Sequence, residues 1–299
     1  MDTLKGKKIL VTGGNGYLGK NLVSALVKND CELYILDKTS SGCPNEIIAD
    51  LTDQEQIKSI VLDLKPNLIY HLAANLNRDR DFLNHDTVMN INYFGTLNLL
   101  NALKNVDYDN FIFTSSSEVY GANDVPFHEK MMPLPASPYS LSKACAEMAI
   151  QTFSELNAKK FTILRLFNFF GKQMPDNFFI PQLVNSLKTG EFFKMTKGEQ
   201  SRDFLYVSDV IKAMILTATH TNALNQTFNV CSGVSITLKE LVCMVKELTH
   251  SECSIQFGAL PYRENEIWNM VGDPAKIKAL LDFSPDYTIK EAISELILN

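Results

Sequence analysis

Tyr139 and Lys143, four residues apart, are the two side chains of this sequence best suited to chemistry. Ser137 and Pro138 just before them are typical of a helix N-cap and first turn, so both side chains should emerge on one helical face. An ammonium beside a phenol favours the phenolate, which turns tyrosine into a base. Lowering a phenol pKa from about 10 to neutrality takes roughly 4 kcal/mol, more than one lysine contact supplies, so a further positive charge should lie close by.

A glycine-rich turn follows the apolar run Lys8–Thr12 and opens a helical pattern. It satisfies G-x-G-x-x-G from Gly14 and G-x-x-G-x-x-G from Gly13. Missing side chains let the backbone approach a pyrophosphate, which the helix N-terminus stabilises with its free amide groups and partial positive charge. The turn predicts a dinucleotide site that includes Gly13, Gly16, Tyr17, Leu18 and Gly19.

The acidic residue Asp37 ends the next strand-like run. A carboxylate at this position accepts hydrogen bonds from the adenosine ribose hydroxyls and repels a 2′-phosphate, so NAD is favoured over NADP. The neighbouring Lys38 weakens that preference, and NADP stays open as the alternative.

Two further strand ends should border the cofactor, because carboxyl ends of parallel strands form the ligand crevice. Asp50, followed by Leu51, either holds the adenine amino group or serves as a helix N-cap. Ala73 and Ala74 either let the backbone pass close to the cofactor or simply pack.

A serine-rich strand end should lie over the nicotinamide position. Thr114 ends a buried run, and the hydroxyls and carboxylate of Ser115–Glu118 follow it. A hydroxyl there can bond a sugar oxygen and relay its proton to Tyr139. The alternative is a serine-rich turn that only caps a helix.

The elements that position these residues are those of an α/β protein. Strand-like runs alternate with helix-like segments, which predicts parallel strands joined by crossover helices. We expect a Rossmann-type doubly wound sheet over residues 1–170 and a smaller substrate-binding lobe over residues 171–299, with some interleaving of segments. The predicted strands are Lys8–Thr12, Glu32–Asp37, Ile47–Ala49, Leu68–Leu72, Phe111–Thr114 and Phe161–Leu166.

The composition is that of an enzyme-sized globular protein, with 299 residues, 45% hydrophobic and 21% charged. A net charge of −6 without a long charge run does not indicate a nucleic-acid partner. No apolar stretch approaches membrane-spanning length, so a cytoplasmic protein without a membrane partner is expected. The six cysteines lack C-x-x-C spacing and the five histidines lack ligand spacing, so reduced thiols and no metal are expected.

The segment Asp86–Lys104 carries an apolar stripe too broad for one buried helix face. It is either a helix wedged within its own domain or part of a helix pair shared with a second subunit. We favour the second reading, which predicts a homodimer.

In this order, the glycine turn, the serine-rich strand end and the Tyr/Lys pair resemble the extended short-chain dehydrogenase/reductases that act on nucleotide sugars. The resemblance runs nearly end to end and is specific to the family, though not to one reaction. Other matching stretches are His71–Ala74, Asn92 with Gly95 and Thr96, Ser116–Gly121, Leu164–Asn168 and Gly198–Phe204.

This resemblance implies roles for individual residues. Tyr139 would take or give the proton of a sugar hydroxyl, Lys143 would lower its pKa and bind the nicotinamide ribose, and Ser116 would bond the C4 oxygen. Family members hold the nucleotide diphosphate with an asparagine and two arginines, whose forks suit phosphate oxygens. The residues matching that set are Asn168, Arg202 and Arg263; the resemblance also places Asn92 and Phe167 at the cofactor and Asn75 and Ser117 at the substrate.

Glu118 bears on which reaction follows. It matches a glutamate of 4,6-dehydratases and glucuronate decarboxylases, whereas UDP-galactose 4-epimerases usually carry a neutral residue there. However, the chain is short for an epimerase or dehydratase, and residues 257–267 resemble those of reductases acting on 4-keto-6-deoxy sugars. We expect an NDP-4-keto-6-deoxyhexose 4-reductase; the alternatives are an NAD-dependent NDP-hexose 4-epimerase and then an NDP-sugar 4,6-dehydratase or decarboxylase.

The loop Asn75–Arg80 departs from the small-residue loop that is usual in the family, and its side chains are expected to line the sugar pocket. A non-catalytic dinucleotide sensor is a further alternative, but such proteins commonly lose the tyrosine or the lysine. This chain keeps both.

Overall fold

The computed structural model describes residues 4–190 and 192–298, so the outer ends of both predicted ranges and residue 191 lie outside it. The strands are β1 Lys8–Thr12, β2 Glu32–Asp37, β3 Glu46–Ile48, β4 Leu68–His71, β5 Asn110–Ser116, β6 Phe161–Leu166, β7 Asn168–Phe170, β8 Phe193–Met195, β9 Ser201–Tyr206, β10 Gln226–Val230, β11 Ser235–Thr237, β12 Ile255–Phe257 and β13 Asn269–Met270. The helices are α1 Tyr17–Leu26, α2 Gln54–Leu64, α3 His85–Met89, α4 Gly95–Leu103, α5 Pro138–Asn157, α6 Phe179–Thr189, α7 Val207–Thr219, α8 Leu238–Leu248, α9 Ala275–Leu281 and α10 Ile289–Leu298. Short helical turns are η2 Phe82–Asn84, η3 Asn90–Phe94, η4 Ser117–Tyr120 and η5 Thr221–Ala223.

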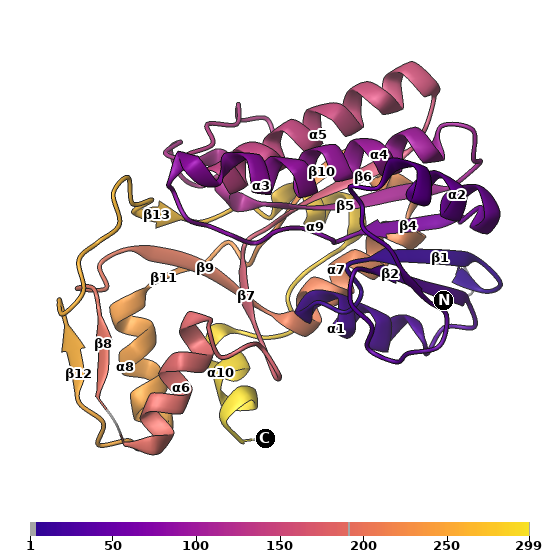
Figure 1. The fold of residues 1–299 in the computed structure, drawn as a ribbon. Helices are drawn as coiled ribbons and strands as arrows, with labels where there is room; N and C mark the ends of the chain where they lie inside the picture. The colour runs from indigo at the N-terminus through magenta and orange to yellow at the C-terminus, as the bar shows by residue number, and fades with distance from the viewer. Residues whose placement is uncertain (1–3, 191, 299) are drawn as a thin grey trace.

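Within the described residues, seven parallel strands form a sheet in the order β10-β6-β5-β4-β1-β2-β3, seen edge-on in Figure 1. The order reverses between β1 and β4, and ligands bind outside the carboxyl ends of the strands at such a reversal. This is the predicted Rossmann-type fold. The predicted bounds hold for β1, β2 and β6, while β5 continues to Ser116.

Helices cover both faces of this sheet (Figure 1). On one face, α1, α7 and α9 pack together, with Leu26 of α1 near Met214 of α7 in one apolar cluster. On the other, Val61 of α2, Leu100 of α4 and Ile150 of α5 share a second cluster. Burial on both faces explains why strands such as β4 are apolar at almost every position.

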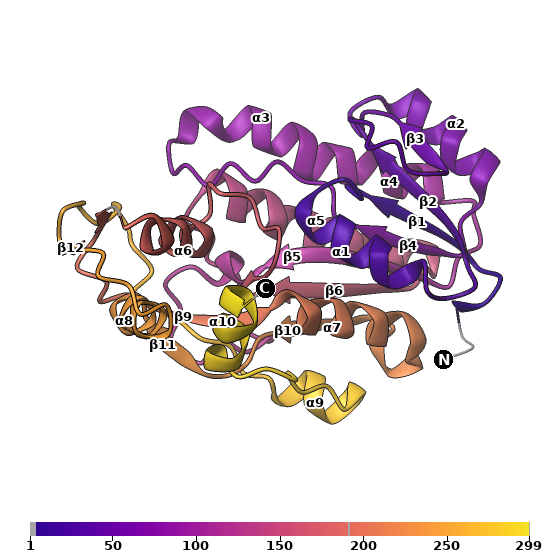
Figure 2. The same cartoon turned by 90° about the horizontal axis from the view of Figure 1, so that it is seen from below.

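A smaller lobe contains, among the described residues, a sheet with the order β11-β9-β13, β7 paired to β9, and a β8–β12 pair. Helices α6, α8 and α10 pack on it, as Figure 2 shows from below. Its chain is not one continuous segment. The strand β7 joins it before residue 170, whereas β10, α7 and α9 belong to the seven-stranded sheet and its helices.

None of the helices in residues 4–190 and 192–298 is long and apolar enough to cross a membrane.

Candidate active site

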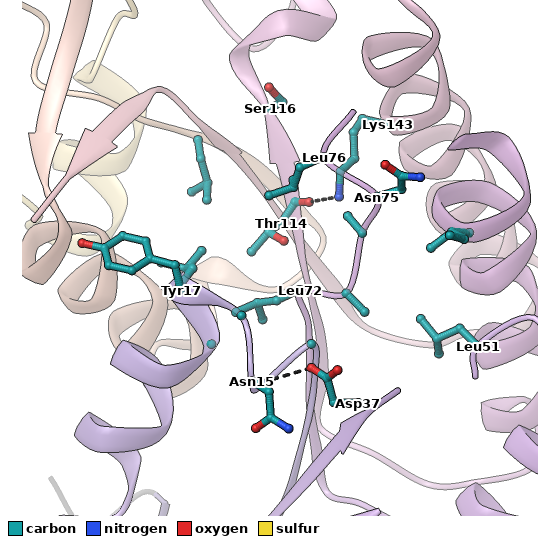
Figure 3. A pocket seen from close by; sticks show the side chains of 18 of the residues that line it. Asn15, Tyr17, Asp37, Leu51, Leu72, Asn75, Leu76, Thr114, Ser116 and Lys143 are labelled. Carbon is teal, nitrogen blue, oxygen red and sulfur yellow. Dashed lines mark hydrogen bonds between the residues drawn. The ribbon is translucent and has the colours of Figure 1, made fainter. Parts of the chain in front are cut away.

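A cavity of about 550 Å³ lies at the carboxyl ends of the parallel strands, where the strand order reverses. Figure 3 shows Asp37 with Asn15 at one end of it and Ser116 with Lys143 at the other. Most of the predicted cofactor residues line this cavity, together with two of the residues predicted to meet the substrate. They are Gly13, Gly16, Tyr17, Leu18, Gly19, Asp37, Asp50, Leu51, Ala73, Ala74, Thr114, Tyr139, Lys143 and Phe167, with Asn75 and Ser116.

The glycine turn packs so closely that side chains cannot be added at two positions. Gly13 has φ of +72°, and a Cβ there would lie 2.6 Å from the backbone nitrogen of Ala73. A Cβ on Gly19 would collide with the carbonyl oxygen of Gly13. Helix α1 starts against this turn with Gly16 as an N-cap that offers no side-chain bond. Its first amide groups and partial positive charge fit a pyrophosphate.

Two carboxylates border the cavity on the side of the glycine turn. The Oδ2 atom of Asp37 accepts a hydrogen bond from the backbone N–H of Asn15 at 3.1 Å (Figure 3). Its Oδ1 atom accepts one from the backbone N–H of Thr39 at 3.2 Å. Asp50 accepts bonds from the amide and hydroxyl of Thr52, which lower its pKa. The glycine cradle fits the pyrophosphate of a dinucleotide, and these acceptors fit its adenosine half.

Helix α5 carries the Tyr/Lys pair in the predicted manner. Ser137 is its N-cap and forms a capping box with Ser140. Tyr139 and Lys143 lie on the buried face, with 4% and 2% of their surfaces exposed. The Lys143 ammonium donates to the carbonyl of Thr114 at 2.8 Å (Figure 3), and burial lowers its pKa to about 7.

Arg78 brings a positive charge to Tyr139, although the pKa of Tyr139 stays above its ordinary value. The Arg78 Cζ lies 5.6 Å from the centroid of the Tyr139 ring, and its Nε lies 3.4 Å from Glu118 Oε1. Burial raises the pKa of Tyr139, the charge of Arg78 acts against that rise, Glu118 adds to it, and hydrogen bonding from Ser116 and Arg78 lowers it. The loop Asn75–Arg80 was expected to line the sugar pocket, and Arg78 does line the cavity, but no pattern in the sequence paired it with Tyr139.

Asn92, predicted at the cofactor, is not among the residues that line the cavity. The helix predicted over 86–104 is interrupted by the π-helical turn η3, which buries the Asn92 side chain. Its Oδ1 accepts a bond from the Asn75 amide at 2.7 Å, and its Nδ2 donates to the Asn75 carbonyl at 3.1 Å and to the Ser142 hydroxyl at 2.9 Å. Asn92 therefore fixes the start of the loop that carries Arg78.

Two predicted substrate residues meet at the thioether of Met270. The Ser117 hydroxyl donates to its sulfur at 3.2 Å, and the Asn168 amide lies 3.7 Å from the same atom. Ser117, Asn168 and Met270 come from η4, β7 and β13, so strands of the small lobe are brought against the end of β5.

Arg202, which was predicted to hold the diphosphate, forms an ion pair with Glu266 and a hydrogen bond with the backbone. Its Nη2 lies 2.7 Å from Glu266 Oε1, and its Nη1 donates to the Ile267 carbonyl at 2.7 Å. Burial lowers the pKa of Arg202, and the charges of Glu118 and Arg263 also act on it. Neither Arg202 nor Arg263 is among the residues that line the cavity.

A buried ion pair behind α5 was not predicted. The Nη2 of Arg165 lies 2.6 Å from Glu147 Oε2, and the Ser115 hydroxyl donates to the same carboxylate. Glu147 follows Lys143 by one helical turn, and Arg165 interrupts the apolar run of β6. A charge within a buried strand was the available signal, because such a residue requires a partner.

The model of the NAD dependent epimerase/dehydratase family matches residues 9–231. The chain is 30% identical to a putative UDP-glucose 4-epimerase of Methanocaldococcus jannaschii over 97% of each chain. It is 29% identical to GDP-6-deoxy-D-talose 4-dehydrogenase of Aggregatibacter actinomycetemcomitans over 96% of each chain. The solved UDP-glucose 4-epimerase of Thermotoga maritima with UDP-glucose superposes with a TM-score of 0.90, at 27% identity and 97% coverage of each chain.

Proposed function

The chain belongs to the NAD dependent epimerase/dehydratase family of nucleotide-sugar enzymes, and we propose that it is an NDP-4-keto-6-deoxyhexose 4-reductase. The observation that carries the proposal is the pairing of Glu118 with Arg78. A dehydratase or decarboxylase would use that carboxylate for a second step at the sugar. Here it is held by a guanidinium, while Ser116, Tyr139 and Lys143 stand at the end of the cavity. The similarity to a 4-dehydrogenase of a 6-deoxy sugar nucleotide supports the same choice.

Reduction of a C4 ketone assigns a separate role to each of these residues. A bound reduced nicotinamide supplies the hydride. Ser116 would bond the C4 oxygen, and Tyr139 would donate the proton that this oxygen needs as it becomes a hydroxyl. Lys143, fixed by the Thr114 carbonyl, would hold the nicotinamide ribose and add positive charge at the phenol. Asn168, Arg202 and Arg263 would hold the nucleotide diphosphate.

A 4-epimerase is the second candidate, favoured by the end-to-end similarity to a putative UDP-glucose 4-epimerase and by the superposition on a solved one. It would use the same residues, with Tyr139 first taking and then returning the proton.

A panel of nucleotide sugars and their 4-keto derivatives, incubated with and without NADH or NADPH, distinguishes the two by NMR of the products. A 4-reductase consumes one cofactor for each 4-hydroxy sugar formed. Turnover of a 4-hydroxy sugar with its C4 epimer as product and no net cofactor consumption would overturn the proposal in favour of the epimerase.

We expect Asp37→Ser to change cofactor preference. The variant loses both the acceptor for the ribose hydroxyls and the charge that repels a 2′-phosphate, so the ratio of kcat/KM for NADH to that for NADPH should fall about tenfold or more. Lys38→Ala is the matched variant, since Lys38 is the next residue and also lines the cavity. It removes a positive charge that would attract a 2′-phosphate, so it should raise the ratio of kcat/KM for NADH to that for NADPH. A preference for NADPH in the unchanged protein would contradict the proposed role of Asp37.

We also propose that the chain forms a homodimer through α3, α4 and α5, which Figure 1 shows side by side on one outer face. Phe94 in η3 and Met148 in α5 are 51% and 56% exposed on these elements. Such exposed apolar side chains on helices that pack together would be covered in a subunit interface. Light scattering should give the mass of two chains for the unchanged protein and of one for Phe94→Lys/Met148→Lys. A single-chain mass for the unchanged protein would contradict the dimer.

A further inference from the structure

Two opposite charges, Arg78 and Glu118, act on Tyr139, and a third charged side chain, Lys143, lines the same cavity. Arg78 comes from the loop after β4, Glu118 from η4, and Lys143 from the same helix as Tyr139. Arg78 lies over the tyrosine ring and also contacts Glu118, so it joins the proton-transfer residue to the carboxylate. Arg78, Ser116, Tyr139 and Lys143 line the same cavity.

Arg78 and Lys143 differ as sources of positive charge. The Lys143 ammonium is directed to the Thr114 carbonyl, and its lowered pKa of about 7 leaves it partly neutral at physiological pH. A guanidinium keeps its charge at every physiological pH. The Arg78 side chain is 41% exposed, so solvent screens part of its charge. Arg78 nevertheless remains charged whatever the redox state of a bound cofactor.

The loop that carries Arg78 is anchored at both ends. Asn92 holds the backbone of Asn75 at its start. The Nη1 of Arg80 donates to the carbonyl of Glu264 at 2.7 Å, which ties the loop to the segment that also carries Arg263. Arg78 therefore stands between two fixed points, with Glu118 as its ionic partner.

We infer that Arg78 is a positioning residue for proton transfer: it stabilises the phenolate of Tyr139, and Glu118 holds its guanidinium at the ring. This inference rests on the proposed use of Tyr139 as the proton donor. The two charges act on Tyr139 with opposite sign, so Arg78 makes the tyrosine a stronger acid and Glu118 weakens that effect. Opposite responses to removing each charge are the signature of this arrangement.

The test follows the ionisation of Tyr139 by NMR of protein labelled with 13Cζ-tyrosine, both alone and saturated with NAD. The Tyr139 signal is assigned by its loss in Tyr139→Phe. Arg78→Met should move the titration midpoint to higher pH, and Arg78→Lys should move it less. Glu118→Gln should move it to lower pH. Lys7→Met removes a positive charge at a residue that does not line the cavity, so it is the control and should leave the midpoint in place.

Kinetics supply the second measurement. The alkaline limb of kcat for ketone reduction should move to higher pH in Arg78→Met, with kcat at pH 7 lowered about tenfold and KM changed much less. An unmoved Tyr139 midpoint in both Arg78→Met and Arg78→Lys would overturn the inference, since a merely structural arginine would alter KM or stability without moving it. A moved midpoint in a protein that reduces no nucleotide sugar would contradict the proposed function and leave the inference standing.

Discussion

Tyr139→Phe is expected to lower kcat for the accepted nucleotide sugar by a factor of about 10³, within the 10² to 10⁴ that a positioned general acid contributes. The substitution removes one oxygen atom and keeps the ring that packs at the base of the cavity. Because the glycine turn and Asp37 are untouched, the dissociation constant for the cofactor should change by less than a few-fold. Product formation followed by NMR, with cofactor binding measured by fluorescence, separates the two effects.

Tyr108→Phe is the matched control for that substitution. Tyr108 is also buried, but it is not among the residues that line the cavity, and its ring lies near the ammonium of Lys159. Its loss of a hydroxyl should leave kcat within about twofold. A Tyr139→Phe enzyme that keeps more than a tenth of the original kcat would remove Tyr139 from the catalytic role.

Arg165→Met is expected to lower the free energy of unfolding by about 3–5 kcal/mol, because it leaves the Glu147 carboxylate buried without its partner. The double variant Glu147→Met/Arg165→Met should recover most of that loss, since apolar side chains of similar size replace a buried pair at little net cost. Urea denaturation of the two variants measures both quantities.

The exposed pair of Lys7 and Asp109 provides the control for this second prediction. Its two side chains are 36% and 56% exposed, so Lys7→Met should cost less than about 1 kcal/mol. If the double variant at Glu147 and Arg165 is as unstable as the single one, the cost comes from repacking rather than from an unpaired charge.

Local signals in the sequence predicted most strands of the seven-stranded sheet and the residues at their carboxyl ends that line the cavity. Apolar runs of four to six residues are almost the whole of a strand buried on both faces, so β1, β2 and β6 have the expected bounds. The N-cap Ser137 and Pro138 likewise mark the start of α5 at the expected residue, which places Tyr139 and Lys143 on one buried face.

Features that depend on long-range contacts were not predictable in the same way. Arg78 meets Tyr139 from a loop whose start is held by Asn92, seventeen residues beyond Asn75, and whose end is held by Glu264. The partner of Arg165 lies on another element, so the strand pattern signals a need for a partner without naming it. Strand β10 is five residues long and pairs with β6, more than fifty residues earlier, and no local pattern encodes that register.

The return of β10, α7 and α9 to the large sheet has an evolutionary consequence. The chain enters the small lobe at β7, leaves it after β9, enters again at β11 and leaves once more for α9. No single cut of the gene therefore separates the large sheet from the small lobe. Recombination could not exchange the small lobe between relatives as one continuous block. We therefore expect specificity in this architecture to change by substitutions made in place, at cavity-lining loops such as the one that carries Asn75 and Arg78.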